Sequence, residues 1–387
     1  MIIGIDGNEA NVKEKVGVSV YTLKLLKYFK KKATKHQQFV VFLKSKPNKD
    51  LPEEFEFYRY AIIRGNFLWS QTFLPLELYK RKALGQNIQV FFSPAHYSPR
   101  FCPIPVVVTI HDLSYFYYPD EFLKKDLYQL KKWTKYSVEK AKKIIAVSNT
   151  TKKDLIKFYS VAEKKIEVVY NGYEKASGRT SGVEEELNNR KNLEVNLRKL
   201  QTKKQNYILY VGTLQPRKNV TVLIDAFYRF KEKKPDYKLV IVGKKGWLFD
   251  HIFKKVKDLN LKKEVEIKGY VSDEELSLLY QNAFCFVLPS LYEGFGIPLL
   301  EAMSFGTPVI SSFHSSLPEV GGDACLYFDP KNSQELSKKL YELTINRKLR
   351  SELVKKGLER IRLFSWQKCA EQTLKILTSD YENKNNR

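Results

Sequence analysis

The sequence has no long hydrophobic run and few cysteines, and both absences narrow the class of protein. No stretch of about eighteen apolar residues occurs, so no transmembrane helix is expected. The four cysteines lie far apart without a C-x2-C pair, which gives no sign of a zinc site or a disulfide framework. The N-terminus also lacks the basic start and cleavage site of a secretion signal, so we expect a cytoplasmic protein.

Acidic residues are scarce relative to basic ones. The 387 residues include 67 Lys and Arg against 43 Asp and Glu, which gives a formal net charge of +24. Such an excess favours anionic partners, namely nucleic acid, anionic lipid head groups or phosphorylated substrates. A basic nucleic-acid-binding protein is therefore one alternative. We expect no nucleic acid as a partner, because no recognisable nucleic-acid module is present.

Short apolar runs rich in Val, Ile and aromatic residues alternate with helix-length segments. The predicted strands are Ile2–Asp6, Phe39–Leu43, Val90–Ser93, Val106–His111, Ile144–Ser148, Ile166–Asn171, Tyr207–Gly212, Leu239–Gly243, Val265–Gly269, Phe284–Pro289, Pro308–Ser312 and Leu326–Phe328. This alternation implies parallel sheets with helices on both faces. The predicted fold class is α/β, with two doubly wound, Rossmann-like domains facing a cleft.

The length and one polar stretch predict the domain boundaries. A chain of 387 residues favours two domains of about 150 to 200 residues each. Residues 174–206 are polar and poor in aromatics, which is typical of a linker or an insertion. We therefore expect an N-terminal domain over 1–173 and a C-terminal domain over 207–362. Apolar residues at helical spacing in the tail, 363–387, predict a last amphipathic helix.

Two carboxylates, Glu293 and Glu301, flank a glycine loop in the second half of the chain. Gly294 and Gly296 allow a ligand to approach backbone N–H groups, and Pro298 beside a helix start directs free N–H groups toward an anion. The stretch predicts a site for a ligand with hydroxyl groups and phosphate, such as a nucleotide-sugar. A helix start with a solvated acidic residue is the alternative.

A second loop, Gly212–Asn219, carries two adjacent cations, Arg217 and Lys218. A planar guanidinium and a point charge suit a diphosphate, although a solvated Arg-Lys pair is the alternative. Ligands bind outside the carboxyl ends of strands in open α/β sheets, and this loop, Glu293 and His111 all follow predicted strands. No D-x-D motif stands near a strand end, so we expect neither a metal nor another cofactor.

The string from Glu293 to Glu301 resembles the E-x7-E signature of family 4 of the retaining glycosyltransferases, also called glycosyl transferases group 1. The resemblance implies the two-domain GT-B fold, with the acceptor bound by the N-terminal domain and the nucleotide-sugar by the C-terminal domain. It further implies that the tail helix packs back on the N-terminal domain. It also implies that Glu293 contacts the donor sugar in catalysis and Glu301 the nucleotide ribose. The residues between them, including Phe295 and Ile297, fall in the donor-binding loop.

Three further segments resemble parts of this family. The loop ending at Lys218 is similar to the phosphate loop, which implies that Lys218 binds the diphosphate. Thr213 stands where many relatives have an arginine, so either Arg217 supplies that charge or the contact is absent. The segment around His111 is similar to one whose histidine reaches the donor sugar, and Asp112 would either orient that ring or cap the next turn. Gly17 resembles a first-domain glycine near the donor, although a plain turn residue fits as well.

The resemblance implies transfer of a sugar, with retention of configuration, from a nucleotide-sugar to a saccharide or lipid-linked acceptor in the synthesis of a cell-surface polysaccharide or glycolipid. The segments Gly243–Trp247 and His111–Tyr115 look like those of members that use GDP-mannose, so mannose is favoured. A glycogen-synthase-like glucan polymerase is the alternative with the same fold.

Lysines concentrate in two segments of the first predicted domain. Lys15 to Lys49 contains ten lysines and no acidic residue, and Lys124 to Lys143 contains eight lysines against Asp126 and Glu139. Cationic amphipathic helices of this kind can hold a protein on an anionic membrane surface, which suits a lipid-linked acceptor. We therefore predict peripheral attachment to the inner face of the plasma membrane, with a merely solvated lysine face as the alternative.

Overall fold

The computed structural model describes residues 1–385 with the exception of 16, 66–67 and 174–204. The chain forms two compact units, Met1–Gly172 together with Trp366–Arg387, and Tyr173–Ser365. Nearly all of the predicted linker or insertion, 174–206, lies outside the described residues.

The first unit is built on a seven-stranded parallel sheet with the order β3-β2-β1-β4-β5-β6-β7. Its strands are β1 (Ile2–Asp6), β2 (Gln38–Leu43), β3 (Tyr58–Ile62), β4 (Val90–Ser93), β5 (Val106–Ile110), β6 (Lys143–Ala146) and β7 (Ile166–Val168). All five residues of β5 are buried, as expected for a central strand covered by helices on both faces. The sequence did not predict β3, because the charged Arg59 interrupts the short apolar run of this edge strand.

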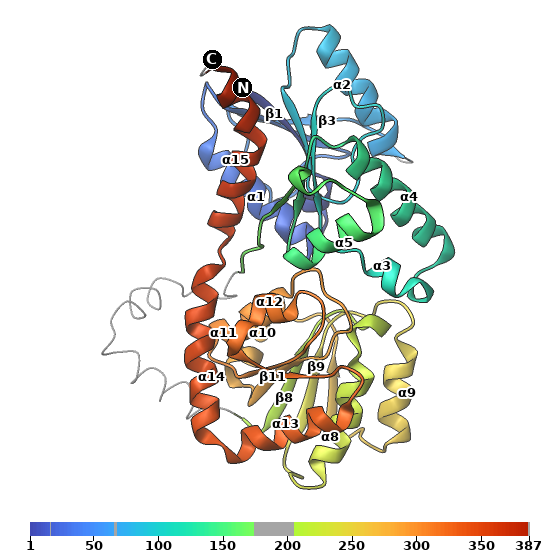
Figure 1. Cartoon of the computed structure of the whole chain (residues 1–387), viewed down its shortest axis with the longest axis vertical. Helices are drawn as coiled ribbons and strands as arrows, with labels where there is room; N and C mark the ends of the chain where they lie inside the picture. The colour runs from blue at the N-terminus through green and yellow to red at the C-terminus, as the bar shows by residue number, and fades with distance from the viewer. Residues whose placement is uncertain (16, 66–67, 174–204, 386–387) are drawn as a thin grey trace, which may run out of the picture. The chain divides into compact units, whose positions relative to one another are not determined.

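Helices cover both faces of this sheet (Figure 1). They are α1 (Val18–Lys32), α2 (Phe73–Ala83), α3 (Ser114–Tyr117), α4 (Lys124–Lys140), α5 (Asn149–Tyr159) and α15 (Trp366–Asn385). The tail helix α15 lies beside α1, and its Cys369 and Ala370 join Leu26 and Phe29 in one buried cluster over the sheet. The apolar residues of the tail recur at helical spacing because they form the face of α15 that makes this contact.

The second unit contains a six-stranded parallel sheet with the order β10-β9-β8-β11-β12-β13. Its strands are β8 (Tyr207–Val211), β9 (Lys238–Val242), β10 (Val265–Lys268), β11 (Cys285–Leu288), β12 (Val309–Ser312) and β13 (Cys325–Phe328). Its helices are α8 (Val220–Lys231), α9 (Asp250–Asp258), α10 (Asp273–Asn282), α11 (Ile297–Ser304), α12 (Leu317–Gly321), α13 (Ser333–Ile345) and α14 (Arg347–Arg360). Helix α8 packs against α9 and α13, while α11 packs against α10, α12 and α14, so two helical layers enclose the sheet (Figure 1).

Both sheets contain the same doubly wound order, in which the first strand of the unit pairs with the second on one side and with the fourth on the other. The chain therefore leaves the first strand toward one edge of the sheet and later returns toward the other edge. Loops that follow the first and fourth strands diverge at this switch point and leave a crevice where ligands bind. The predicted α/β class with two Rossmann-like domains is confirmed.

Candidate active site

The switch point of the second unit brings Arg217, Lys218 and Glu293 together. The cations lie on a short 3-10 helix after β8, and Glu293 lies in the loop after β11. Lys218 Nζ is 2.5 Å from Glu293 Oε1, and Arg217 Nη1 is 3.8 Å from Glu293 Oε2. Two residues that are 75 positions apart in the sequence thus meet beyond the carboxyl ends of β8 and β11, where ligands bind in open α/β sheets.

Glu293 is only 8% exposed, yet its carboxyl group is held in the ionised form. Burial alone would raise its pKa, but the charges of Lys218 and Arg217 outweigh burial, and hydrogen bonds from Lys218 and Ser290 add to their effect. The net result is a pKa below the ordinary value of 4.5. Two cations against one carboxylate leave the cluster with positive charge, which suits a diphosphate ligand.

Hydroxyl groups hold the loop of Glu293 in place. Ser290 Oγ donates to Glu293 Oε1 at 2.7 Å, and Ser315 Oγ accepts from the backbone N–H of Glu293 at 2.8 Å. Ser316 Oγ donates to the carbonyl oxygens of Glu293 and Phe295 at 2.8 and 3.0 Å. The sequence prediction missed these serines, although Ser315 and Ser316 follow the carboxyl end of β12, on the same side of the sheet as the site.

The segment Gly294–Ile297 turns the chain into α11. Gly296 has a φ of +100°, and a Cβ atom there would lie 2.7 Å from Leu317 Cδ2, so the position requires glycine. The side chain of Phe295 is buried and packs edge-on against Phe364 at a centroid distance of 5.6 Å. The buried ring anchors the loop at the positive end of the α11 dipole, where Pro298 lacks an N–H group and the N–H of Leu299 donates to the carbonyl oxygen of Gly296 at 3.0 Å.

Glu301 lies on α11 and is partly buried. Burial raises the pKa of its carboxyl group to about 7, although the Tyr280 hydroxyl donates a hydrogen bond to Oε2 at 3.0 Å. Glu301 therefore changes its charge close to neutral pH. The sequence prediction contained no role for Tyr280.

The loops after β8 and β9 press closely together. A Cβ atom at Gly243 would lie 1.9 Å from the carbonyl oxygen of Gly212, so no larger residue fits there. Leu214 N donates to Lys244 O, and Gly246 N donates to Leu214 O, both at 2.9 Å. Thr213 lies in this double loop and adds no charge to it.

Asn219 closes the phosphate loop at the start of α8 and was not assigned a role from the sequence. Its backbone adopts a left-handed conformation with a φ of +56°, which asparagine tolerates better than most residues. Its Nδ2 donates to the carbonyl oxygens of Pro289 and Pro330 at 3.1 and 2.7 Å. The side chain thereby ties the loops after β8, β11 and β13 to one another.

The first unit holds His111 directly after β5. Its Nε2 lies 2.7 Å from the carbonyl oxygen of Pro94, which can only accept, so Nε2 carries the proton. Burial, and then the neighbouring His96 ring at a centroid distance of 5.5 Å, lower the pKa of His111 to about 3. The ring is therefore neutral at physiological pH.

Two further residues of the first unit were predicted with open roles. Asp112 Oδ1 accepts from the backbone N–H and the hydroxyl of Ser114 at 3.1 and 2.8 Å, so it caps the turn that leads into α3, one of its two predicted roles. Gly17 occupies the N-cap position of α1, with a φ of +50° and open space on its Cβ side.

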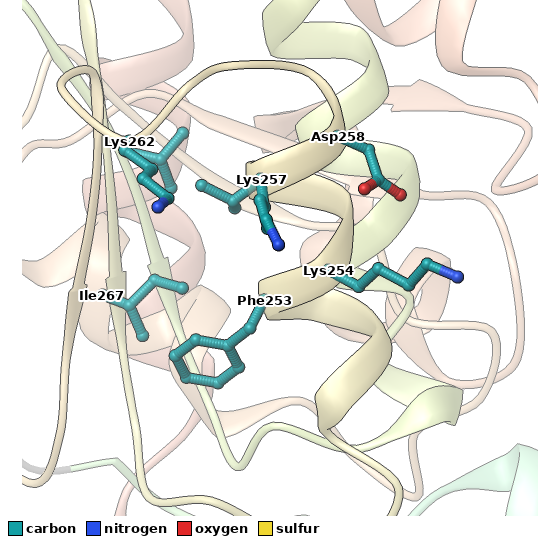
Figure 2. A pocket seen from close by; sticks show the side chains of 8 residues that line it. Phe253, Lys254, Lys257, Asp258, Lys262 and Ile267 are labelled. Carbon is teal, nitrogen blue, oxygen red and sulfur yellow. The ribbon is translucent and has the colours of Figure 1, made fainter.

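A separate hollow of about 660 Å³ lies between α9 and the edge strand β10. Figure 2 shows Phe253 of α9 directed toward Ile267 of β10, whereas Lys254 and Asp258 point away from Ile267. Its lining includes none of the predicted site residues.

The described part of the chain contains neither a candidate metal cluster nor a helix able to cross a membrane. Within these residues, no group of three or more His, Cys, Asp or Glu side chains could hold a metal ion. None of the described helices combines the length and the hydropathy needed to cross a membrane. The absence of a metal requirement stays a prediction.

Comparison with known proteins covers both units. Residues 16–176 match the family model Glycosyltransferase Family 4, and residues 194–360 match the model Glycosyl transferases group 1. The chain is 34% identical to O-antigen chain mannosyltransferase B from Escherichia coli over 286 residues, which cover 74% of this chain and 73% of that protein.

Solved structures share the fold across both chains. Sucrose-phosphate synthase from Thermosynechococcus elongatus is similar with a TM-score of 0.74 at 19% identity, over 99% of each chain. Anabaena Alr3699/HepE in complex with UDP-glucose is similar with a TM-score of 0.70 at 16% identity, over 98% of this chain and 99% of that chain. The chain belongs to glycosyltransferase family 4, with the two-domain GT-B fold, and is a glycosyltransferase.

Proposed function

We propose that this glycosyltransferase moves mannose from a nucleotide-sugar to a saccharide or lipid-linked acceptor, with retention of configuration, in the synthesis of a cell-surface polysaccharide. The cluster of Arg217, Lys218 and Glu293 carries the proposal, because it places two cations beside an ionised hydroxyl-binding carboxylate at a switch point. The similarity to O-antigen chain mannosyltransferase B supports mannose. The UDP-glucose bound to Anabaena Alr3699/HepE supports a nucleotide-sugar donor.

In this proposal the cations of the cluster contact the diphosphate of the donor, and the carboxylate contacts its sugar. Lys218 and Arg217 neutralise the diphosphate as the bond between sugar and phosphate breaks. Glu293 accepts hydrogen bonds from sugar hydroxyl groups, and the N–H groups of Gly294 to Ile297 approach the donor from the end of α11. Glu301 accepts a hydrogen bond from the ribose.

His111 acts as a neutral hydrogen-bonding group in this proposal. With Nε2–H committed to Pro94, its Nδ1 is left as an acceptor for a hydroxyl group of the donor sugar. The departing phosphate then takes the proton of the acceptor hydroxyl, so no side chain needs to form a covalent intermediate. Donor binding by Gly17 follows from the family resemblance and its position at the N-cap of α1.

We also propose that the first unit attaches to an anionic membrane surface. Leu123 and Tyr128 at the start of α4 are 71% and 65% exposed beside the exposed Lys124 and Lys125. Exposed apolar and basic side chains together suit the interface of an anionic bilayer. Flotation with anionic vesicles should exceed that with neutral vesicles, and equal flotation would refute the attachment.

A donor screen tests the proposed activity. A matching nucleotide-sugar should raise the melting temperature of the full chain through binding linkage, with GDP-mannose above UDP-, dTDP- and ADP-sugars. The same donor should transfer its sugar to a mannoside acceptor. If no nucleotide-sugar shifts the melting temperature or reacts, the proposed activity is wrong.

A further inference from the structure

The first unit carries a hollow of about 300 Å³ at its own switch point. The end of β1 and the segments that follow β1, β2, β3 and β4 line it, together with residues of α4. Its chemically informative lining residues are Asp6, Glu9, Lys44, Trp69, Tyr97 and Trp133. The volume lies at the lower end of the range of about 300 to 1,000 Å³ for small-molecule pockets.

The polar lining of this pocket is weakly acidic. Asp6 Oδ1 accepts hydrogen bonds from the backbone and side-chain nitrogens of Asn8 at 3.1 and 2.7 Å. Burial raises the pKa of Asp6, and burial together with the neighbouring Asp6 raises the pKa of Glu9. Lys44 is the one cation among the lining residues, and its Nζ lies 5.7 Å from the centroid of the Trp69 ring. Two carboxylates against one lysine contrast with the net charge of +24 for the chain.

Aromatic rings form much of the remaining wall. Tyr97 and Trp133 meet edge-on at a centroid distance of 5.4 Å, and Trp69 is fixed by a hydrogen bond from Nε1 to the carbonyl oxygen of Ile63 at 2.7 Å. Carboxylates accept hydrogen bonds from hydroxyl groups, while rigid aromatic rings contact the C–H groups of a sugar. A phosphate or carboxylate ligand would instead face Asp6 and Glu9, whose like charge disfavours it.

We propose that this pocket binds one neutral, hydroxyl-rich sugar unit of the acceptor and discriminates against uronate and phosphorylated sugars. The inference rests on the proposed transferase activity and adds the chemical class of the acceptor. Asp6 and Glu9 accept its hydroxyl groups, and Tyr97 and Trp133 contact its apolar side. The phosphate of a lipid-linked acceptor therefore lies outside this pocket.

Saturation-transfer NMR on the full chain tests the pocket with two probes, methyl α-D-mannopyranoside and methyl α-D-glucuronide. The neutral probe should bind at least about tenfold more tightly than the uronide, because the uronide brings like charge against the carboxylates. Glu9→Gln should narrow this ratio several-fold by removing one repulsive charge. The amide has the size and shape of the carboxyl group that it replaces, so Glu9→Gln should leave the fold intact, and the exposed Glu14→Gln in the same loop is the matched control.

Two results would overturn the inference: equal binding of both probes to the unmodified protein, or an unchanged ratio in Glu9→Gln. Donor binding, followed by the thermal shift with GDP-mannose, should stay the same in Glu9→Gln. If instead no nucleotide-sugar binds the unmodified protein, the proposed activity itself fails, while the sugar probes still report on the pocket.

Discussion

The two switch points of this protein share a strand order but differ in chemistry. In the second unit, the loops after β8 and β11 bring two cations to one buried carboxylate. In the first unit, β1, the loops after β1, β3 and β4, and α4 contribute carboxylates and aromatic rings to a pocket with one lysine. The topology fixes where a ligand can bind, and the loop residues decide which ligand fits. We therefore propose a phosphate-binding site on one sheet and a sugar-binding site on the other, although the two sheets share a strand order.

The largest effect is expected from Lys218→Ala, which removes the cation nearest Glu293. Transfer should fall by about 10²- to 10³-fold, because a charge that stabilises the departing diphosphate is lost. Steady-state kinetics with the preferred nucleotide-sugar would measure the loss. Lys257 belongs to α9 and lines the separate hollow between α9 and β10, so Lys257→Ala is the matched control and should retain full activity. Comparable losses in both variants would show that the cluster has no special role.

Glu293→Gln should separate sugar binding from phosphate binding. Transfer should fall by about 10²-fold, whereas the free nucleoside diphosphate should bind equally well or more tightly, because both cations lose their carboxylate partner. Calorimetric titration of the diphosphate beside the kinetics measures both effects. Loss of diphosphate binding would contradict this division.

The same variant makes a prediction about pH and stability. The pKa of Glu293 is lowered in the fold, so its stabilising effect is present above the unfolded value of 4.5 and is lost as the pH falls through the folded value. The destabilisation caused by Glu293→Gln should therefore be largest near neutral pH and shrink below pH 4.5. Denaturant unfolding at several pH values would measure it.

His111→Ala should lower kcat by about tenfold or more, since a positioned hydrogen-bond partner of the sugar is lost. In the unmodified protein, no step from His111 should appear in the pH profile between 5 and 8, because its pKa is about 3. NMR titration of the imidazole signals checks this directly. Protonation of His111 near pH 6.5 would contradict the neutral role.

The smallest effect concerns Glu301, whose pKa is about 7. Donor affinity should rise a few-fold as the pH passes upward through 7, because the ionised carboxylate accepts the ribose hydroxyl more strongly. The raised pKa also means that stability is lost as the pH rises from 4.5 through 7. Glu301→Gln should flatten both profiles, which titration and thermal melts would measure. A pH dependence that persists in the variant would assign it to another group.

The sequence predicted those parts of the site in the second unit that depend on the local pattern of apolar and polar residues. Apolar runs end where polar loops begin, so the positions of Lys218 and Glu293 at strand ends followed from the strands. The serines that hold Glu293 and the asparagine that ties three loops could not be assigned in this way. Their hydrogen bonds join segments that only the folded sheet brings together, as Ser315 with Glu293 illustrates.

The pocket of the first unit was not predicted at all. Asp6, Lys44, Tyr97 and Trp133 come from four separate segments, and none belongs to a recognisable motif. Their side chains converge only because the strand order places the ends of β1, β2 and β4 next to one another. His96 was likewise given no role, although its ring lies beside that of His111.

Hydrogen exchange with and without the donor tests most directly whether the switch point of the second unit binds the nucleotide-sugar. Donor addition should give the strongest protection in peptides that cover Gly212–Asn219 and Ser290–Ile297. The peptide that covers Asp6–Asn11 should change less, because its pocket is assigned to the acceptor. Unchanged exchange in both loops of the second unit, at a donor concentration that supports transfer, would contradict the account.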